Sequence, residues 1–419
     1  MHLNEEFLLK DQNVSTAGDT ISLPRHRWYY YKEGFSPSLV KKAIEMLSLE
    51  ENDLIIDPFN GSGTVTLTCS ENNVKSIGLE VNPFTAFIAK TKVKSAKIKQ
   101  FDNDVKFIIE KVHKPKTSPL QNFSTFTEFS GKTKWLFNSE VLNSYYAGLS
   151  NLDNIKNENT KALIKLALIR AIMENSNVRR DGKCLRYRNN WQDLHYNKET
   201  YLESLEKRLC IIREDLNCEN KLKIPKIICG DSRKILSKSM KEKFSLCITS
   251  PPYLNTFDYT DIYRPELFLG GFVNSMEELY KLRLNTIRSH IQAKWEKPII
   301  NDFGTMYATA ISEILKRQDQ LMHCNIPMMI QAYFEDMSNI LKMLRNNAKD
   351  NAELWLVVST SAYAGIEIPV DMIIGEIGNK VGWALKEIGV LRHIRKRKTK
   401  YSKEIDHLRE SVVIFTASK

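Results

Sequence analysis

Cysteine is scarce in this sequence, with seven cysteines at positions 69, 184, 210, 218, 229, 247 and 324 among 419 residues. None of them forms a CxxC pair or a His and Cys spacing typical of a zinc site, which argues against a structural metal and a disulfide framework. We therefore expect reduced, mostly packed thiols and no metal ion.

Long hydrophobic runs are also missing. No run approaches the length of a membrane span, and the first residues, MHLNEEFLLKDQ, lack the basic start and apolar core of a signal peptide. We expect a cytoplasmic protein without a membrane partner. The length allows one large domain with insertions, or two domains, and a hydrophobic content of 42% is ordinary for a globular protein.

Acidic residues are outnumbered, since 61 Lys and Arg against 50 Asp and Glu give a net charge of +11. A basic balance suits a polyanionic partner, because phosphate contacts supply most of the sequence-independent affinity for nucleic acid. A solvated basic surface explains the same excess. The charge alone therefore does not decide between the two interpretations.

A short apolar run ends at two prolines in the stretch ITSPPYLNTFDY, which spans residues 248–259. The run from Phe244 to Ile248 reads as a buried strand, and proline can neither donate to a sheet nor continue it, so a loop must follow. In a doubly wound sheet such strand ends face the ligand crevice. There the Ser250 hydroxyl and the Pro251 carbonyl can accept the two protons of an exocyclic amine, while Tyr253 stacks on the attached base. A proline-stiffened turn explains the tetrapeptide equally well.

A glycine turn follows an earlier predicted strand, in the stretch DLIIDPFNGSGTVTLT at residues 53–68. Gly61 and Gly63 allow close approach of a ligand to the backbone, and a helix from about Thr64 offers free amides for a carboxylate or a phosphate. The next predicted strand ends at Glu80, which can bind both hydroxyls of a ribose. A nicotinamide-dependent enzyme would show a similar pattern.

Taken together, DPFNGSGT at residues 57–64 and Ser-Pro-Pro-Tyr at residues 250–253 resemble the motifs of the S-adenosylmethionine-dependent DNA amino-methyltransferases. The resemblance covers residues 26–90 and 226–419. In this family the serine form of the second motif is associated mainly with the cytosine 4-amino group, and forms starting with Asp or Asn mainly with the adenine 6-amino group. The resemblance implies S-adenosyl-L-methionine as cofactor and the catalytic residues Ser250, Pro251, Pro252 and Tyr253.

The same resemblance implies a set of cofactor residues. Phe35 and Pro37 would contact the methionine and adenosine parts, Glu80 the ribose, and Asp231 the adenine amino group. For Asp231, capping of the next helix is a structural alternative, and both roles are compatible. The complete set is Phe35, Pro37, Asp57, Pro58, Phe59, Asn60, Gly61, Ser62, Gly63, Thr64, Glu80, Asn82, Pro83, Asp231 and Ser232.

Two further segments allow both a structural and a functional interpretation. The aromatic cluster Trp28 to Tyr31 suits packing as well as ligand binding. Asp258 and Tyr259 lie close enough to the Ser-Pro-Pro-Tyr motif to line a target pocket, but a helix cap is an equally good interpretation of Asp258.

The order of the strand ends predicts an α/β, Rossmann-like methyltransferase fold. We expect a doubly wound, mostly parallel seven-stranded sheet with an antiparallel terminal hairpin at residues 384–397 and 410–417, plus helical insertions. The predicted organisation is an N-terminal arm (1–25), a discontinuous catalytic domain (26–95 and 226–419), a helical insertion (96–225) and a second insertion (271–330). The first insertion falls between the second and third strands, unlike the family's usual arrangements, so the sequence does not show which insertion reads DNA.

Candidate DNA contacts cluster in the stretch NVRRDGKCLRYRNNW, where basic residues alternate with aromatic ones around an expected Asp181-Gly182 turn. They are Arg179, Arg180, Lys183, Arg186 and Arg188. A solvated basic face is the alternative. Weaker candidates are a basic loop at residues 392–403 and, in the second insertion, Arg283, Arg288, Ser289 and His290. The lone His290 is more typical of a surface residue than of a catalytic base.

The resemblance therefore implies a site-specific methyltransferase that acts on the 4-amino group of a cytosine flipped out of double-stranded DNA, in a restriction-modification system with a separately acting endonuclease. Adenine 6-amino methylation of DNA, amino methylation of RNA, and a non-enzymatic DNA-binding protein are the alternatives. Methylation of cytosine carbon 5 requires a nucleophilic cysteine, usually after proline, and the chain contains no Pro-Cys pair.

Overall fold

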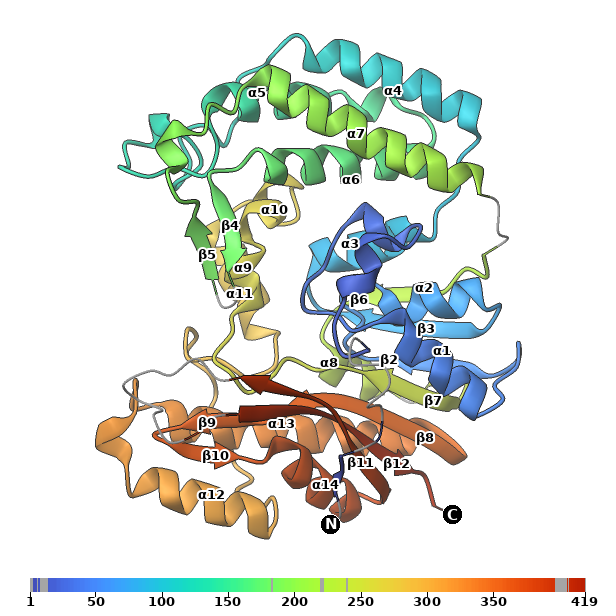
Figure 1. The fold of residues 1–419 in the computed structure, drawn as a ribbon, viewed down its shortest axis with the longest axis vertical. Helices are drawn as coiled ribbons and strands as arrows, with labels where there is room; N and C mark the ends of the chain where they lie inside the picture. Colours follow the sequence, from blue (N-terminus) through green and yellow to red (C-terminus); the bar gives the residue numbers. More distant parts are fainter. Residues whose placement is uncertain are drawn as a thin grey trace.

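The computed structural model describes residues 3–5, 7, 14–181, 184–218, 222–238, 240–395, 405 and 407–418. At its centre lies a sheet with the strand order β1-β11-β12-β8-β7-β2-β3-β6 (Figure 1). The strands are β1 (Leu3–Asn4), β2 (Leu54–Asp57), β3 (Lys75–Glu80), β6 (Lys226–Cys229), β7 (Phe244–Thr249), β8 (Ala348–Ser359), β11 (Ala384–Arg395) and β12 (His407–Thr416).

Most neighbouring strands of this sheet are parallel. β2 pairs in parallel with β3 and β7, β3 with β6, and β7 with β8, whereas β12 runs antiparallel to both β8 and β11. This arrangement confirms the predicted Rossmann-like methyltransferase fold with its terminal hairpin. The short β1 adds an eighth strand, since Leu3 pairs with Ile388 at the edge of the sheet. Part of the expected N-terminal arm is therefore bound to the sheet.

Helices cover both faces of the sheet. Successive side chains of a strand point to opposite faces, and because the buried strands are apolar on both faces, each face needs a covering layer. Ile55 and Ile248 share a core with α1 (Pro37–Met46) and α2 (Thr64–Glu71). Ile56 and Cys247 share the opposite core with α13 (Ile326–Asn347) and α14 (Val370–Lys380). The cofactor and target motifs thus leave the sheet at strand ends that are fixed from both sides.

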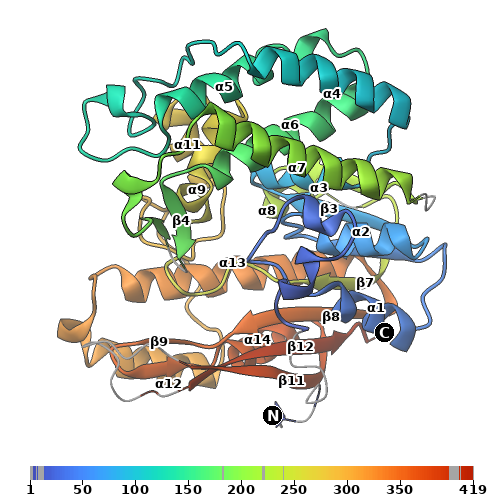
Figure 2. The same ribbon diagram turned by 45° about the horizontal axis from the view of Figure 1, so that its top comes forward.

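A separate helical layer carries a short hairpin (Figures 1 and 2). Its helices are α4 (Ile98–Val112), α5 (Ser139–Leu149), α6 (Glu158–Glu174) and α7 (Lys198–Asn217), and the hairpin strands are β4 (Val178–Asp181) and β5 (Cys184–Tyr187). The core of this layer also includes Phe84 of α3 (Pro83–Lys92) and Leu267 of α10 (Arg264–Leu269). The layer is therefore packed against elements next to the central sheet.

The second insertion is less helical than predicted. It contains α11 (Met276–Leu284) and α12 (Thr305–Leu315), and residues 285–304 between them carry neither helix nor strand. The remaining elements are α8 (Ser232–Leu236), α9 (Tyr259–Ile262), β9 (Ser361–Tyr363), β10 (Ile366–Ile368) and the 3-10 helices η1 (Gly18–Ile21), η2 (His26–Trp28), η3 (Glu128–Ser130), η4 (Leu152–Asn154), η5 (Trp191–Asp193) and η6 (Gln318–Gln320). In the described part of the chain, no helix combines the length and the apolar character that crossing a bilayer requires.

The cysteines depart from the expectation of mostly packed thiols. Cys69 and Cys247 are buried in the central sheet and its helices, but Cys210, Cys218, Cys229 and Cys324 are exposed, and all seven are free thiols. Cys210, for example, is exposed on the solvent-facing side of α7. The apolar periodicity of the sequence predicts a helix here but does not show which side of it faces solvent.

Candidate active site

A cavity of about 620 Å³ lies at the carboxyl ends of β2, β3, β6 and β7. Asp57 ends β2, Glu80 ends β3, Asp231 lies two residues after β6, and Ser250 directly follows β7. In the sheet β2 lies between β3 and β7, so the chain order reverses there, which is where ligands bind in open α/β sheets. The structure brings the two sequence motifs to one cavity, on adjacent strands.

The glycine turn needs glycine at two positions. Gly61 has φ +48° and Gly63 has φ +86°, a region that other residues adopt only with strain. A Cβ atom on Gly63 would also lie 2.8 Å from the Cβ of Ala89, so α3 packs directly behind the turn. Thr64, the first residue of α2, lies in the cavity wall, which places the free amides of the helix N-terminus beside the cavity.

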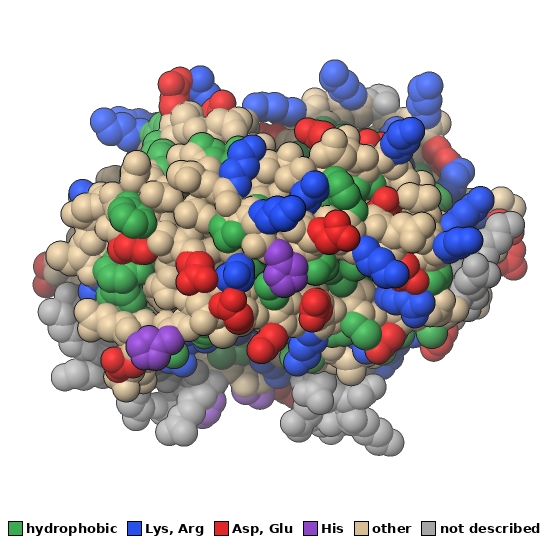
Figure 3. Space-filling model, turned by 90° about the horizontal axis from the view of Figure 1, so that it is seen from above, with side chains coloured by type: hydrophobic (Ala, Val, Ile, Leu, Met, Phe, Trp, Pro, Cys, Tyr) green, Lys and Arg blue, Asp and Glu red, His purple; other side chains and the backbone are tan. Residues whose placement is uncertain are grey.

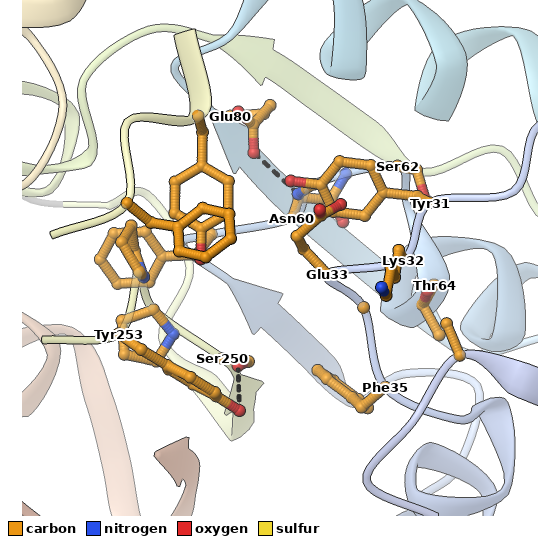
Figure 4. Close-up of a pocket in the computed structure, with 18 of the residues that line it drawn as sticks. Tyr31, Lys32, Glu33, Phe35, Asn60, Ser62, Thr64, Glu80, Ser250 and Tyr253 are labelled. Carbon is orange, nitrogen blue, oxygen red and sulfur yellow. Dashed lines mark hydrogen bonds between the residues drawn. The ribbon is translucent and has the colours of Figure 1, made fainter. Parts of the chain in front are cut away.

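Glu80 ties the glycine turn to the end of β3. One carboxylate oxygen accepts the Gly61 N–H at 2.7 Å, and the other accepts the Asn82 N–H at 2.8 Å. Burial raises the pKa of Glu80 above its ordinary value. The side chain lies in the cavity wall (Figure 4), where its remaining lone pairs suit a pair of ribose hydroxyls.

Asp57 is a second buried carboxyl group in the wall, with 2% of its surface exposed. It accepts hydrogen bonds from the Thr249 hydroxyl at 2.5 Å and from the Phe59 N–H at 3.0 Å. Burial raises the pKa of Asp57 to about 7, because the charged form loses its hydration. A cation bound in the cavity would favour the ionised form, so Asp57 suits a positively charged ligand group.

Most of the expected cofactor residues lie in the cavity wall. They are Phe35, Asp57, Pro58, Phe59, Asn60, Gly61, Ser62, Thr64, Glu80, Asn82, Asp231 and Ser232. Gly63, Pro37 and Pro83 stand outside the wall, where Gly63 caps α2 and the two prolines are the first residues of α1 and α3. Their place is structural, in the turns and helix starts that shape the wall.

Asp231 combines both expected arrangements, because it caps a helix and also lies in the wall. Its carboxylate accepts the Arg233 N–H at 3.0 Å at the start of α8 and also binds the Arg233 guanidinium. The neighbouring Ser232 hydroxyl donates to the Pro58 carbonyl, which joins this strand end to the glycine turn.

The Ser-Pro-Pro-Tyr residues form another part of the wall, with Ser250, Pro251, Pro252 and Tyr253 all in contact with the cavity. The Tyr253 hydroxyl donates to Glu410 at 2.6 Å, and the Ser250 hydroxyl donates a longer hydrogen bond of 3.4 Å to the Tyr253 oxygen (Figure 4). Burial, together with the negative charge of Glu410, raises the pKa of Tyr253 well above its ordinary value. The phenol is therefore a stable hydrogen-bond donor at neutral pH.

The sequence did not indicate the part of the cavity wall that comes from the terminal hairpin, next to the Ser-Pro-Pro-Tyr residues. Glu410 on β12 and Arg392 on β11 both line the cavity, and the Arg392 Nε donates to the second oxygen of Glu410 at 2.7 Å. Glu410 lies 157 residues beyond Tyr253 in the chain, so no local pattern connects them. Only the pairing of β12 with β8, next to β7, brings them together.

The ambiguous aromatic cluster is divided between packing and the cavity. Trp28 and Tyr29 are 2% and 1% exposed and belong to the core of the helical layer, whereas Tyr30 and Tyr31 line the cavity. The Tyr31 ring stacks on Tyr263 with 5.3 Å between ring centroids. The sequence places four aromatic residues side by side and does not show which rings face the core and which face the cavity.

The segment after the Ser-Pro-Pro-Tyr motif also has one structural residue and one residue that faces the cavity. Asp258 caps α9 by accepting the Thr260 N–H at 2.9 Å, and it pairs with Arg283 at 2.6 Å. Its neighbour Tyr259 lines the cavity together with Phe257.

The hairpin β4–β5 presents its arginines on opposite faces. Arg179 pairs with Arg186 across the two strands, and both side chains are exposed. Arg180 points the other way, where it forms an ion pair with the fully buried Glu266 and lies 4.3 Å above the Tyr263 ring. Arg188 donates to the Ser176 carbonyl at 2.9 Å, and Lys183 lies outside the described residues.

Three of the weaker DNA-contact candidates of the second insertion are buried, and the fourth, Arg283, is half-buried and paired with Asp258. Arg288 binds Glu335 at 2.6 Å and Asp336 at 2.8 Å, and Ser289 and His290 are each 1% exposed. Burial lowers the pKa of His290 to about 4, so this residue is a neutral interior group and the expectation of a surface histidine is wrong. Ion pairing that crosses between elements cannot be read from the sequence of one element.

Two further sequence expectations concern charged groups. Most of the basic loop at residues 392–403 lies outside the described residues, apart from the segment 392–395 that ends β11. Among the described residues, no three His, Cys, Asp or Glu side chains lie together in a group that could hold a metal ion.

Comparisons with known proteins agree with the geometry of the cavity. The model of the N6_N4_Mtase family, described as a DNA methylase, matches residues 9–91. The type II methyltransferase M.BsoBI of Geobacillus stearothermophilus is 29% identical over 415 residues, which cover 88% of this chain and 80% of the relative. The type II methyltransferase M.AvaI of Nostoc sp. is 27% identical over 398 residues, covering 88% of this chain and 81% of the relative.

Proposed function

Because the chain belongs to the DNA amino-methyltransferases of type II restriction-modification systems, with S-adenosylmethionine as methyl donor, we propose that it methylates the 4-amino group of a cytosine flipped out of double-stranded DNA. The observation that carries this choice of base is the serine at the first position of the Ser-Pro-Pro-Tyr motif, beside the cavity. The family resemblance associates that serine mainly with cytosine.

The cavity has the groups that the cofactor requires. Glu80 would hold the ribose, the turn from Phe59 to Gly63 would line the methionine end, and the buried carboxyl group of Asp57 would lie near its positive charge. When bound, S-adenosylmethionine supplies a methyl group on a sulfonium, which makes that methyl electrophilic. The fit depends on a carboxylate, a close backbone turn and a second buried acid, all of which the wall contains.

The target half would position and polarise the amine. The Ser250 oxygen and the Pro251 carbonyl accept its N–H protons, which favours the tetrahedral form with a free lone pair. Tyr253 offers its ring for stacking against the base, since its hydroxyl is already bound to Glu410. No covalent enzyme intermediate is needed, because alignment of nitrogen and methyl group supplies the catalysis.

The hairpin β4–β5 is the proposed contact with the DNA backbone. Arg180 anchors it beside the cavity, through Tyr263, which stacks on the wall residue Tyr31. Arg179 and Arg186 then face outward, where both are exposed and can reach phosphates, and Arg186 also pairs with Asp181 at 3.2 Å. We infer that the helical layer with this hairpin is the DNA-recognition region, and that a cognate endonuclease acts separately on the same sites.

The outer face of the helical layer is a less suitable DNA surface. Seen from above in Figure 3, basic, acidic and hydrophobic side chains are interspersed over that face. Mixed charges do not produce the one-sign potential that attracts a phosphate backbone. This supports placing the DNA on the hairpin side, beside the cavity.

The test is to identify the methylated base. Plasmid DNA is incubated with the protein and S-adenosylmethionine labelled in its methyl group, digested to nucleosides and analysed by mass. We expect labelled N4-methylcytosine. Labelled N6-methyladenine would overturn the choice of base, and methyl transfer to RNA alone would overturn the choice of substrate.

A further inference from the structure

A hydrogen-bonded chain leads from the target site into the terminal hairpin. It runs from the Ser250 hydroxyl to the Tyr253 oxygen at 3.4 Å, and from the Tyr253 hydroxyl to Glu410 at 2.6 Å. All three residues line the cavity. Glu410 is only 3% exposed, and its second oxygen accepts from Arg392 at 2.7 Å.

The direction of this chain follows from the chemistry of its last member. An ionised carboxylate only accepts hydrogen bonds, so the Tyr253 hydroxyl must donate its hydrogen to Glu410. The Tyr253 oxygen then has only lone pairs to offer, and the Ser250 hydroxyl must donate to it. With its hydrogen committed, the Ser250 oxygen presents lone pairs to anything else in the cavity.

We propose that Glu410 is a positioning residue, which acts through Tyr253 to turn the Ser250 hydroxyl into an acceptor for the target amine. The inference rests on the proposed function, in which Ser250 accepts an N–H of the base. A serine hydroxyl, unlike the side-chain carbonyl of Asn or the carboxylate of Asp, carries a hydrogen that would otherwise be free to point at the amine. Glu410 gives that hydrogen a fixed destination.

Arg392 supports the same arrangement. A buried carboxylate is costly unless it is paired and hydrogen-bonded, and the guanidinium of Arg392 together with the Tyr253 hydroxyl satisfies both oxygens of Glu410. Charge-assisted hydrogen bonds to Glu410 are stronger than neutral ones, so they hold the Tyr253 hydroxyl in one orientation. The terminal hairpin thereby takes part in the target site.

The test is a double-mutant cycle of Glu410→Gln and Tyr253→Phe, measured by single-turnover methyl transfer to DNA. A glutamine amide can donate to the Tyr253 oxygen, and phenylalanine has no hydroxyl, so each change frees the hydrogen of Ser250. We expect each single variant to transfer methyl roughly 10- to 100-fold more slowly, which is at or below the roughly 100- to 1000-fold loss when a preorganised donor is removed directly, because each change acts on the amine only through Ser250. The double variant should be no slower than the slower single variant, because the same chain is already broken.

Other readouts separate positioning from damage to the fold. We expect calorimetric affinity for S-adenosylhomocysteine and KM for DNA to change less than about twofold, since Glu410 makes no contact with either in the proposed arrangement. Glu353→Gln is the matched control, because Glu353 is also buried on this sheet and is bound by Trp355 at 2.7 Å and Lys386 at 2.6 Å, away from the cavity. That control should transfer methyl at the wild-type rate.

Two results would overturn the inference. One is a wild-type rate in Glu410→Gln, and the other is multiplication of the two single losses in the double variant. Should Glu410→Gln fail to fold, the Tyr253→Phe variant still decides, because a wild-type rate without the hydroxyl removes any need for the chain. The mass of the wild-type product tests the base assignment separately, since Ser250 faces an amino group in cytosine and in adenine alike.

Discussion

The proposed cofactor half of the cavity is held by backbone groups close together in the chain, whereas the proposed target half is held by side chains from distant strands. Glu80 accepts the N–H groups of Gly61 and Asn82, all within one strand-turn-helix-strand unit. Tyr253 instead depends on Glu410, 157 residues away. The geometry of a half built from local backbone groups follows from the local fold. A half built from side chains of distant strands can instead be changed by substitution without moving the backbone.

This difference predicts that the two halves can be disabled independently. The largest effect should come from Tyr253→Ala, which removes the stacking ring and the hydroxyl that binds Glu410. We expect turnover to fall by at least about 100-fold, because base stacking alone contributes roughly 1–3 kcal/mol and the hydrogen-bonded chain is lost as well. Affinity for S-adenosylhomocysteine, measured by calorimetry, should stay within about twofold of wild type.

The Tyr253→Phe variant is the control for this first change, since it keeps the ring and loses only the hydroxyl. Its activity should lie between those of wild type and Tyr253→Ala. An equal loss of cofactor affinity and turnover in Tyr253→Ala would show that the two halves are not independent.

A smaller effect is expected in the cofactor half, from Asp57→Asn. The pKa of Asp57 is about 7 in the unliganded protein, and a bound cation favours the ionised form. Binding of S-adenosylmethionine therefore releases a proton below pH 7, so affinity should rise with pH up to about 7 and then level off. Asp57→Asn should bind with about tenfold lower affinity at neutral pH and lose this part of the pH dependence, as followed by calorimetry.

The same group gives a stability test with a defined sign. Because the folded pKa of Asp57 is raised above the value of 3.8 for an unperturbed Asp, its contribution to stability is fully present at low pH and is lost as pH rises through about 7. In the absence of cofactor, the stability of Asp57→Asn should therefore no longer contain this decrease as pH rises through about 7. Asp53→Asn is the control, since Asp53 lies outside the cavity wall, and an unchanged pH profile in Asp57→Asn would contradict the raised pKa.

The same contrast explains which residues of the cavity wall could be predicted from the sequence. The glycine turn and Glu80 form one continuous motif, so their place in the wall was predictable from spacing. Ser250 and Tyr253 were predictable for the same reason, but Glu410 and Arg392 were not, because their contact with Tyr253 depends on strand order in the sheet. Sequence patterns locate residues within a unit, and tertiary packing decides which units meet.

The arginines of the β4–β5 hairpin show the same limit within a single motif. Their spacing predicts a basic loop in which Arg179 and Arg180 contact DNA together. In the strand, however, successive side chains point to opposite faces, so Arg179 is exposed while Arg180 is bound to Glu266. The residue that shares a face with Arg179 is Arg186, which the cross-strand register places opposite it.

The smallest of the predicted effects should distinguish these two faces. The double variant Arg179→Ala with Arg186→Ala removes two candidate phosphate contacts, so the slope of log affinity for DNA against log salt should become shallower by roughly 2. Titrations of labelled duplex DNA at several salt concentrations measure this slope. Arg180→Ala is the comparison, because it leaves Glu266 buried with only the Tyr29 hydroxyl and without its positively charged partner. This variant should have a lower melting temperature and an unchanged salt slope. A shallower slope in Arg180→Ala, with none in the double variant, would reverse the assignment of the two faces.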